Sequence, residues 1–237
     1  MQKGLTAFQL KLIAITAMLI DHLAWYYVDL DTGLGQLLHM VGRLTAPIMC
    51  FFIAEGYRHT RSLRRYAARL AVFALISQLP FTYYSLGRAA LFPLNVIYTL
   101  LIGLLAIHCL ETIPNESKRW GLIGLLLLLA VPADWSVVGV VLCLGFYSMS
   151  GDWPRLTALL AAASLAMMAG QAAWRMLNGY SFAWALHYSW FQGGVLLSVF
   201  LLRLYNGEKG GGPWSRWLFY LFYPLHQAVL AVLRWRF

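Results

Sequence analysis

The sequence predicts an all-α protein, a polytopic transmembrane helical bundle of about nine spans. Of its 237 residues, 61% are hydrophobic and 11% are charged, and the mean hydropathy is +0.66. Soluble domains carry about 45–50% apolar and about 25% charged residues. A spanning helix needs about 20 mostly apolar residues, and the run from Phe8 to Val28 has that length. The composition therefore places the chain in a lipid bilayer.

Nine apolar segments are candidates for membrane spans. They cover residues 8–28, 35–56, 67–86, 92–110, 119–132, 136–149, 156–173, 184–203 and 216–233. The fifth and sixth are short, and the alternative interpretation makes them one broken or re-entrant hairpin around Pro132-Ala133-Asp134. No repeat or domain boundary is visible, so residues 1–237 are predicted to form a single membrane-embedded domain. The only linker-like stretch is the glycine-rich segment Tyr205 to Pro213.

The net charge of +9 is explained by the placement of Lys and Arg around these segments. With nine spans, thirteen basic residues lie on the side of the N-terminus and four lie on the other side, and Arg43 lies inside a span. Because Lys and Arg accumulate in cytoplasmic loops, the N-terminus is predicted to be cytoplasmic. The same bias accounts for the charge without nucleic-acid binding.

Asp21 and His22 interrupt the first apolar run. A charge at the bilayer centre costs about 2.5–3.5 kcal/mol on insertion scales, so such residues usually line a protein interior or a wet cavity and serve chemistry. Histidine is the usual general base near neutral pH, and a carboxylate fixes its tautomer. Arg43 lies at a similar predicted depth, either as the countercharge of Asp21 or as a stabiliser of a developing oxyanion. Asn95 enters its segment from the same side. A single polar group in a membrane helix can also do no more than join helices.

A basic stretch follows the second segment, beginning at Glu55 and His59 and continuing through Arg61, Arg64 and Arg65. Arginine forks match phosphate oxygens, which makes the stretch a candidate site for a polyphosphate such as coenzyme A. The alternative is that these arginines only set the orientation of the protein in the membrane and contact lipid head groups. The sequence has neither a glycine-rich phosphate loop nor a Cys/His spacing typical of a metal site.

The loop Tyr205-Asn206-Gly207 with Lys209 forms a second cytoplasmic candidate. A glycine-rich stretch of this kind is also consistent with a turn and no further role.

In these residues the chain resembles the TraX family, membrane proteins whose founding member acetylates the N-terminus of conjugative F-type pilin. The resemblance covers almost the whole length, and the order and spacing of its motifs are specific. The motifs are Asp21-His22, Gly42-Arg43 with Pro47 and Phe51-Phe52, Glu55-Gly56, His59-Thr60-Arg61, Tyr66, Arg69, Ser77, Pro80-Phe81, Asn95-Val96, Thr99-Leu100, Gly103-Leu104, Tyr205-Asn206-Gly207 and Tyr223-Pro224-Leu225-His226.

The resemblance implies an acetyltransferase of the bacterial inner membrane with acetyl-CoA as co-substrate and no metal. The acceptor would be extracytoplasmic, most concretely the N-terminal amine of a pilin-like protein. The alternatives are an O-acyltransferase acting on a glycan or lipid, and a transporter or pilus-assembly scaffold without enzymatic activity. The predicted catalytic residues are His22, Asp21, Arg43 and Asn95, the CoA-binding residues are Glu55, His59, Arg61, Arg64, Arg65, Tyr205, Asn206 and Lys209, and the acceptor-binding residues are Tyr223 and His226.

Overall fold

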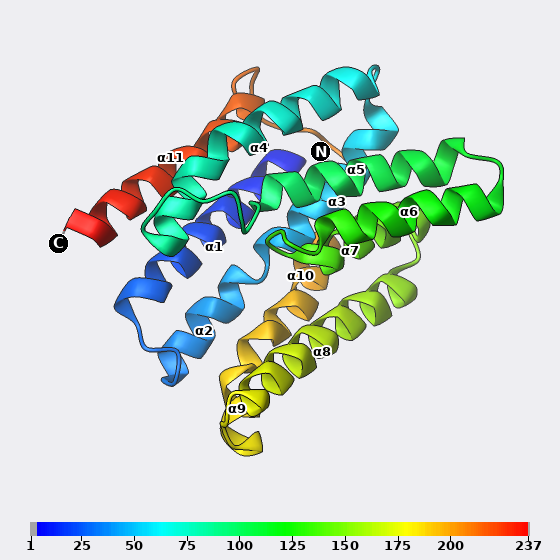
Figure 1. Ribbon diagram of the computed structural model, residues 1–237. Coiled ribbons are helices and arrows are strands. Elements are labelled where there is room, and N and C mark those ends of the chain that lie inside the picture. The colour runs from blue at the N-terminus through cyan, green and yellow to red at the C-terminus, as the bar shows by residue number, and fades with distance from the viewer. Residues whose placement is uncertain (1–3, 237) are drawn as a thin grey trace. The chain divides into compact units, whose positions relative to one another are not determined.

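The computed structural model describes residues 4–236, and the regular secondary structure in that range is helical. It consists of helices α1 to α11 and one short 3-10 helix, η1 (Trp190–Gly193) (Figure 1). The described residues contain two isolated β-bridges, Leu5 with Tyr205 and Leu94 with Ala133, and no sheet. The predicted all-α class is confirmed.

The chain divides into two compact units, each assembled from segments that are distant in the sequence. Unit 1 contains the residues up to Ile48 together with Gly151–Gly212. Unit 2 contains Met49–Ser150 together with the residues from Pro213 onward. The single domain expected from the sequence stays a prediction.

Unit 1 contains two groups of helices that η1 joins (Figure 1). In the first group α1 packs along α2, and in the second α8 packs against α9 and α10. The 3-10 helix η1 contacts both α2 and α8, so it lies between the two groups. The bounds are α1 Ala7–Tyr27, α2 Gly33–Gly42, α8 Trp153–Leu177, α9 Phe182–Tyr188 and α10 Gly194–Leu202.

The beginning of α1 is capped by its own sequence and by a loop from the far end of unit 1. The Thr6 hydroxyl accepts from the Gln9 amide and the Gln9 side chain accepts from the Thr6 amide, which makes a capping box. The next two amides donate to backbone carbonyls, that of Ala7 to Glu208 at 2.9 Å and that of Phe8 to Lys209 at 3.0 Å. These bonds satisfy amides that the start of a helix leaves without intrahelical partners.

Unit 2 contains two packed groups of helices, which are joined by the contact between α4 and α5 (Figure 1). Helix α4 packs along α11, and the Arg234 side chain donates to the Tyr84 carbonyl at 2.8 Å near their C-terminal ends. Helix α5 packs against α4, α6 and α7, and Gly103 lets the Cys143 side chain approach the α5 backbone. The bounds are α3 Thr45–His59 (which begins in unit 1), α4 Leu63–Leu86, α5 Val96–Thr112, α6 Glu116–Ala130, α7 Ser136–Ser148 and α11 Ser215–Arg236.

Each of the nine predicted segments corresponds to one helix or to a consecutive set of helices. The segment predicted over 35–56 is two helices, because α2 ends at Gly42 and α3 begins at Thr45. The segment predicted over 184–203 contains α9, η1 and α10, with a bend of 44°. The fifth and sixth segments are the separate helices α6 and α7, of 15 and 13 residues.

Several of these helices are long and apolar enough to cross a membrane. Among the described residues, three meet that standard: Ala7–Tyr27, the stretch Gly33–His59 and Trp153–Leu177. The pair α9 with η1 and α10 makes a fourth if it is one broken span, and α5 and α7 are shorter apolar helices. At 1.5 Å per residue, α7 is roughly 20 Å long, less than the ~30 Å hydrocarbon core of a bilayer. The nine-span topology therefore stays a prediction.

Candidate functional site

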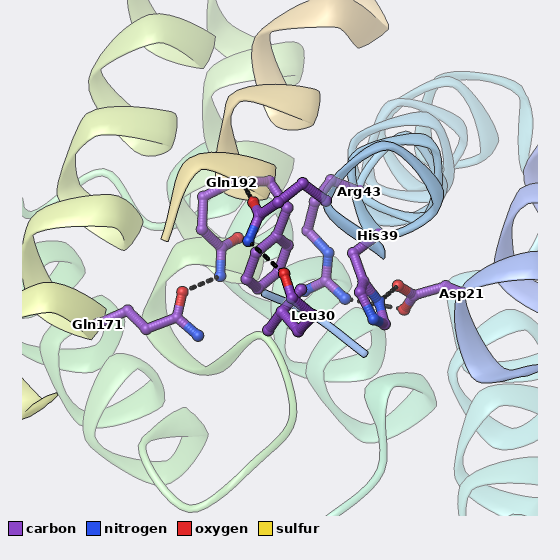
Figure 2. Close-up of polar contacts among 8 residues, drawn as sticks. Asp21, Leu30, His39, Arg43, Gln171 and Gln192 are labelled. Atoms are coloured by element: carbon purple, nitrogen blue, oxygen red, sulfur yellow. Dashed lines mark hydrogen bonds and ion pairs between the residues drawn. The ribbon is translucent and has the colours of Figure 1, made fainter. Parts of the chain in front are cut away.

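Helices α1 and α2 bring three ionisable side chains together in unit 1, and we call Asp21, His39 and Arg43 the α1–α2 polar centre. Asp21 Oδ1 lies 2.7 Å from His39 Nδ1, and Arg43 Nη2 donates to Asp21 Oδ2 at 2.8 Å. Figure 2 shows the His39 ring and the Arg43 guanidinium turned toward the aspartate. One carboxylate thus holds an imidazole and a guanidinium at once.

Sequence spacing and two glycines explain why the three groups meet. His39 and Arg43 are four residues apart, so they share one face of α2 and its C-terminus. Gly42 lies against the Asp21 side chain, where any larger residue would overlap the carboxylate. A side chain on Gly194 would likewise overlap the α2 backbone at Met40 and the Arg43 Cβ. These missing side chains allow α1 and the start of α10 to pack closely on the end of α2.

The imidazole of His39 is fully buried among aromatic rings. Its ring centroid lies 4.2 Å from that of Trp25 and 5.6 Å from that of Phe191, and the Arg43 guanidinium carbon lies 5.2 Å from the Phe191 centroid. His39 Nε2 is buried and has no hydrogen-bond partner within residues 4–236. A neutral imidazole that donates its Nδ1 hydrogen to a carboxylate carries its lone pair on Nε2. In that tautomer, Nε2 would be the proton-accepting atom of the ring.

Buried glutamines fix the segment that carries Phe191. Gln36 donates through Nε2 to the Leu30 carbonyl at 2.9 Å and accepts through Oε1 from the Phe191 amide at 2.9 Å. One residue on, Gln192 donates to Gln171 Oε1 at 3.2 Å (Figure 2). These bonds connect α2, η1 and α8, so the aromatic wall beside His39 has a defined position.

Asp21 and Arg43 form an ion pair of opposite charges within the polar centre. Asp21 is 5% exposed, and a buried carboxylate is tolerated only when it is paired and hydrogen-bonded. Arg43 supplies the opposite charge and His39 supplies a second hydrogen bond. Removing one partner of such a buried pair typically costs about 3–5 kcal/mol, because the remaining charge has no compensation.

The Asp21 carboxylate makes its observed side-chain contacts with His39 and Arg43. The pairing of Asp21 with Arg43 was one of the two roles that the sequence left open for this arginine, and it is the one observed. His22 is partly exposed on α1, whereas the imidazole at Asp21 Oδ1 is that of His39. His39 was missed in the sequence, although its position four residues before Arg43 in an apolar helix was a usable signal.

Asn95 lies in unit 2, where its side chain is occupied by the local fold. Asn95 Oδ1 caps α5 by accepting from the Ile97 amide at 3.1 Å. Its Nδ2 donates to the Ala74 carbonyl at 2.7 Å and to Gln78 Oε1 at 2.9 Å. An oxyanion role would require this amide to give up one of these bonds.

The predicted CoA-binding stretch belongs to unit 2 and contains two kinds of residue. Glu55 binds the Arg58 guanidinium at 2.5 Å and lies 3.7 Å from His59 Nε2. Arg58 also donates to the carbonyls of Phe146 and Tyr147, at 3.0 and 2.7 Å, so it fixes the end of α7. The remaining arginines are exposed and form no ion pair with a carboxylate of residues 4–236; they are Arg61, Arg64 and Arg65.

The predicted loop candidates Tyr205, Asn206 and Lys209 belong to unit 1 and are tied to the start of α1. The Asn206 amide donates to the Leu5 carbonyl at 3.0 Å, and Asn206 Oδ1 accepts from the Glu208 amide at 2.9 Å. The backbone of this loop thus has a structural function in capping α1, while the binding roles of its side chains stay predictions.

The predicted acceptor-binding residues Tyr223 and His226 are buried on α11 in unit 2. His226 Nδ1 donates to the Phe222 carbonyl at 2.8 Å, and the two rings are stacked at 4.8 Å. His226 is therefore held in one orientation by its own helix.

Comparison with known proteins adds a family to this geometry. A protein of Dichelobacter nodosus named probable fimbrial assembly protein FimC, serogroup H1, is 34% identical over 237 residues, which covers 95% of this chain and 94% of that protein. No solved structure matches the chain. The family model described as TraX protein matches residues 7–234, and the chain therefore belongs to the TraX family.

Proposed function

We propose that this protein is an acetyltransferase of the bacterial inner membrane. It moves an acetyl group from cytoplasmic acetyl-CoA to the N-terminal amine of a pilin-like protein on the other side. Membership of the TraX family supports this, and so does the relative named for fimbrial assembly. The observation that carries the proposal is the buried α1–α2 polar centre, in helices long and apolar enough to span a membrane. Ionisable groups in such a position usually serve function.

The chemistry is acyl transfer between sulfur and nitrogen. The amine nitrogen attacks the thioester carbonyl, the new C–N bond forms, and the C–S bond breaks. A membrane histidine accepts the amine proton and returns it to the departing thiolate. The sequence assigns this step to His22, oriented by Asp21. An α-amino group has a pKa of about 7.7–8.0, so a modest base suffices to free it.

The donor would bind at the exposed arginines after α3. Arg61, Arg64 and Arg65 offer guanidinium groups without a protein carboxylate partner in the described structure, which suits phosphate oxygens. Glu55 and His59 precede these arginines in the sequence, and Tyr205, Asn206 and Lys209 are the second donor-site candidates. With nine spans and a cytoplasmic N-terminus, the three arginines face cytoplasmic acetyl-CoA. Tyr223 and His226 are the candidates for contact with the acceptor.

The test uses membrane vesicles that contain the intact protein, acetyl-labelled CoA and a peptide with a pilin-like N-terminus. We expect label in the peptide with a free N-terminus and none in the same peptide with a blocked N-terminus. Label in carbohydrate or lipid would instead establish the O-acyltransferase alternative. If no fraction of the native membrane becomes labelled, the protein is a scaffold or transporter.

The donor site is tested separately with the triple change of Arg61, Arg64 and Arg65 to Gln. We expect the KM for acetyl-CoA to rise while the protein still inserts. The matched control is Arg88→Gln, because Arg88 is also exposed and lies on the opposite side in the predicted topology. An unchanged KM in the triple variant would place the phosphate site elsewhere.

A further inference from the structure

We propose that His39, rather than His22, is the proton acceptor of the transfer reaction. This inference rests on the proposed acetyltransferase function and names the imidazole that serves it. It follows from three features of unit 1: the contact between His39 and Asp21, the free Nε2 atom, and the position of Trp25.

The first feature is the carboxylate contact. A general base that works through one ring nitrogen is oriented by a carboxylate on the other, which also stabilises the imidazolium once it forms. Asp21 makes this contact with His39 Nδ1 at 2.7 Å. Arg43 binds the other oxygen of Asp21, so the carboxylate cannot turn away from the imidazole without losing that ion pair.

The second feature is the unpaired nitrogen. Buried side-chain nitrogens nearly always have a hydrogen-bond partner, and each exception calls for an explanation. His39 Nε2 is such an exception within the described structure, and its whole residue is 0% exposed. A structural histidine in an apolar site gains nothing from an unpaired lone pair, whereas a general base requires one.

The third feature is the covering layer over the ring. The Trp25 ring lies 4.2 Å from the His39 ring, while Trp25 itself is 42% exposed. One partly exposed side chain therefore lies directly on the imidazole. We expect rotation of Trp25 to admit an acceptor amine to the ring, and the return of Trp25 to exclude water during transfer.

The proton balance of the step is complete. As the amine nitrogen bonds to the acetyl carbon, its proton passes to His39 Nε2, and Asp21 stabilises the resulting imidazolium. Collapse of the tetrahedral intermediate breaks the C–S bond, and Nε2 returns the proton to the thiolate of coenzyme A. The products are the N-acetylated amine and free coenzyme A, and His39 regains its starting state.

The decisive variant is His39→Asn. The asparagine amide can still donate to Asp21, as Nδ1 does, but it offers no base in place of Nε2. If His39 is the proton acceptor, transfer of label from acetyl-CoA falls by about 10²–10⁴-fold, the usual contribution of general acid–base catalysis. If His39 only holds Asp21 in place, the asparagine variant keeps a rate near that of the wild type. His187→Asn, a histidine change outside the polar centre in the same unit, is the matched control.

A second measurement keeps the result clear if the asparagine variant inserts poorly. His39→Ala leaves a space beside Trp25 and Phe191 that free imidazole can occupy, and we expect added imidazole to restore part of the transfer. The same addition should not rescue His22→Ala. If His22→Asn loses all transfer of label while His39→Asn stays active, the inference is overturned, but the acetyltransferase function is supported. If the wild-type protein transfers no label, the function itself fails, and this inference fails with it.

Discussion

Gly42 lies directly against the side chain of Asp21, and a methyl group on this glycine would overlap the aspartate Cβ, Cγ and Oδ1. The close approach brings the end of α2 to the carboxylate and so sets the geometry of the polar centre. A side chain at position 42 would have to push α2 away from α1.

Gly42→Ala is therefore expected to loosen the polar centre. Overpacking of a tight site typically costs about 1–3 kcal/mol, so the unfolding temperature in detergent should fall together with the transfer rate. Gly33→Ala, in the same helix but with open space around the glycine, is the control and should change neither quantity by much. If Gly42→Ala changes the unfolding temperature and the transfer rate no more than Gly33→Ala does, the close contact between Gly42 and Asp21 is not required.

Asp21 and Arg43 are expected to be strongly coupled. Asp21→Asn and Arg43→Met should each destabilise the protein by about 3–5 kcal/mol, because each leaves a charge buried without its partner. The double variant removes both charges, so its loss should be smaller than the sum of the single losses. Unfolding of the four proteins of this cycle in detergent measures the coupling free energy. Strictly additive losses would mean that the ion pair contributes nothing to stability.

Arg58 is expected to be a structural arginine, in contrast to its exposed neighbours. Arg58→Met removes the pair with Glu55 and two hydrogen bonds to the end of α7, so a loss of about 2–3 kcal/mol is expected. Arg64→Gln should stay within about 0.5 kcal/mol, as surface substitutions usually do. Thermal unfolding distinguishes the two, and a KM effect confined to Arg58→Met would reverse their assignment.

Asn95→Ala is expected to lower stability by about 1–2 kcal/mol, because α5 loses its N-cap and the Ala74 carbonyl loses a donor. Asn95→Asp keeps the capping oxygen and should be destabilised less. The kcat of the folded fraction tests the oxyanion role predicted from the sequence. Removal of an oxyanion donor costs about 10²–10³ in kcat, so a fall of that size would assign the role to Asn95.

The predicted topology is tested with reporters fused after Arg65 and after Asp31. We expect the fusion after Arg65 to be active with a cytoplasmic reporter, because this stretch is rich in arginine. The fusion after Asp31 should be active only with a periplasmic reporter. A periplasmic signal after Arg65 would invert the topology and place the proposed donor site outside the cytoplasm.

The sequence predicted helices well where composition and capping residues act locally. The first span was predicted over 8–28 and is Ala7–Tyr27, because a polar cap precedes a continuous apolar run there. The end of α2 at Gly42 was missed, because apolar residues continue on both sides of Arg43.

The polar centre was predicted in part. Asp21 and Arg43 stood out because a charge in an apolar segment requires a partner. Two opposite charges in neighbouring apolar segments therefore predict an ion pair. His39 did not stand out, because a single histidine in a membrane helix is often only a helix contact. Its importance depends on which atom faces Asp21 and on the rings of Trp25 and Phe191, and these are properties of packing between distant segments.

The split composition of unit 1 has a consequence for biosynthesis. Gln36 accepts from the amide of Phe191, 155 residues further along the chain, and Ala7 donates to the carbonyl of Glu208. At a synthesis rate of about 5–20 residues per second, the ribosome needs roughly 8–30 s to make that intervening stretch. During this interval the translocon and surrounding lipid must accommodate α1 and α2 before the rest of their unit exists. The aromatic wall beside His39 is thus completed only after every helix of unit 2 except α11 has been synthesised.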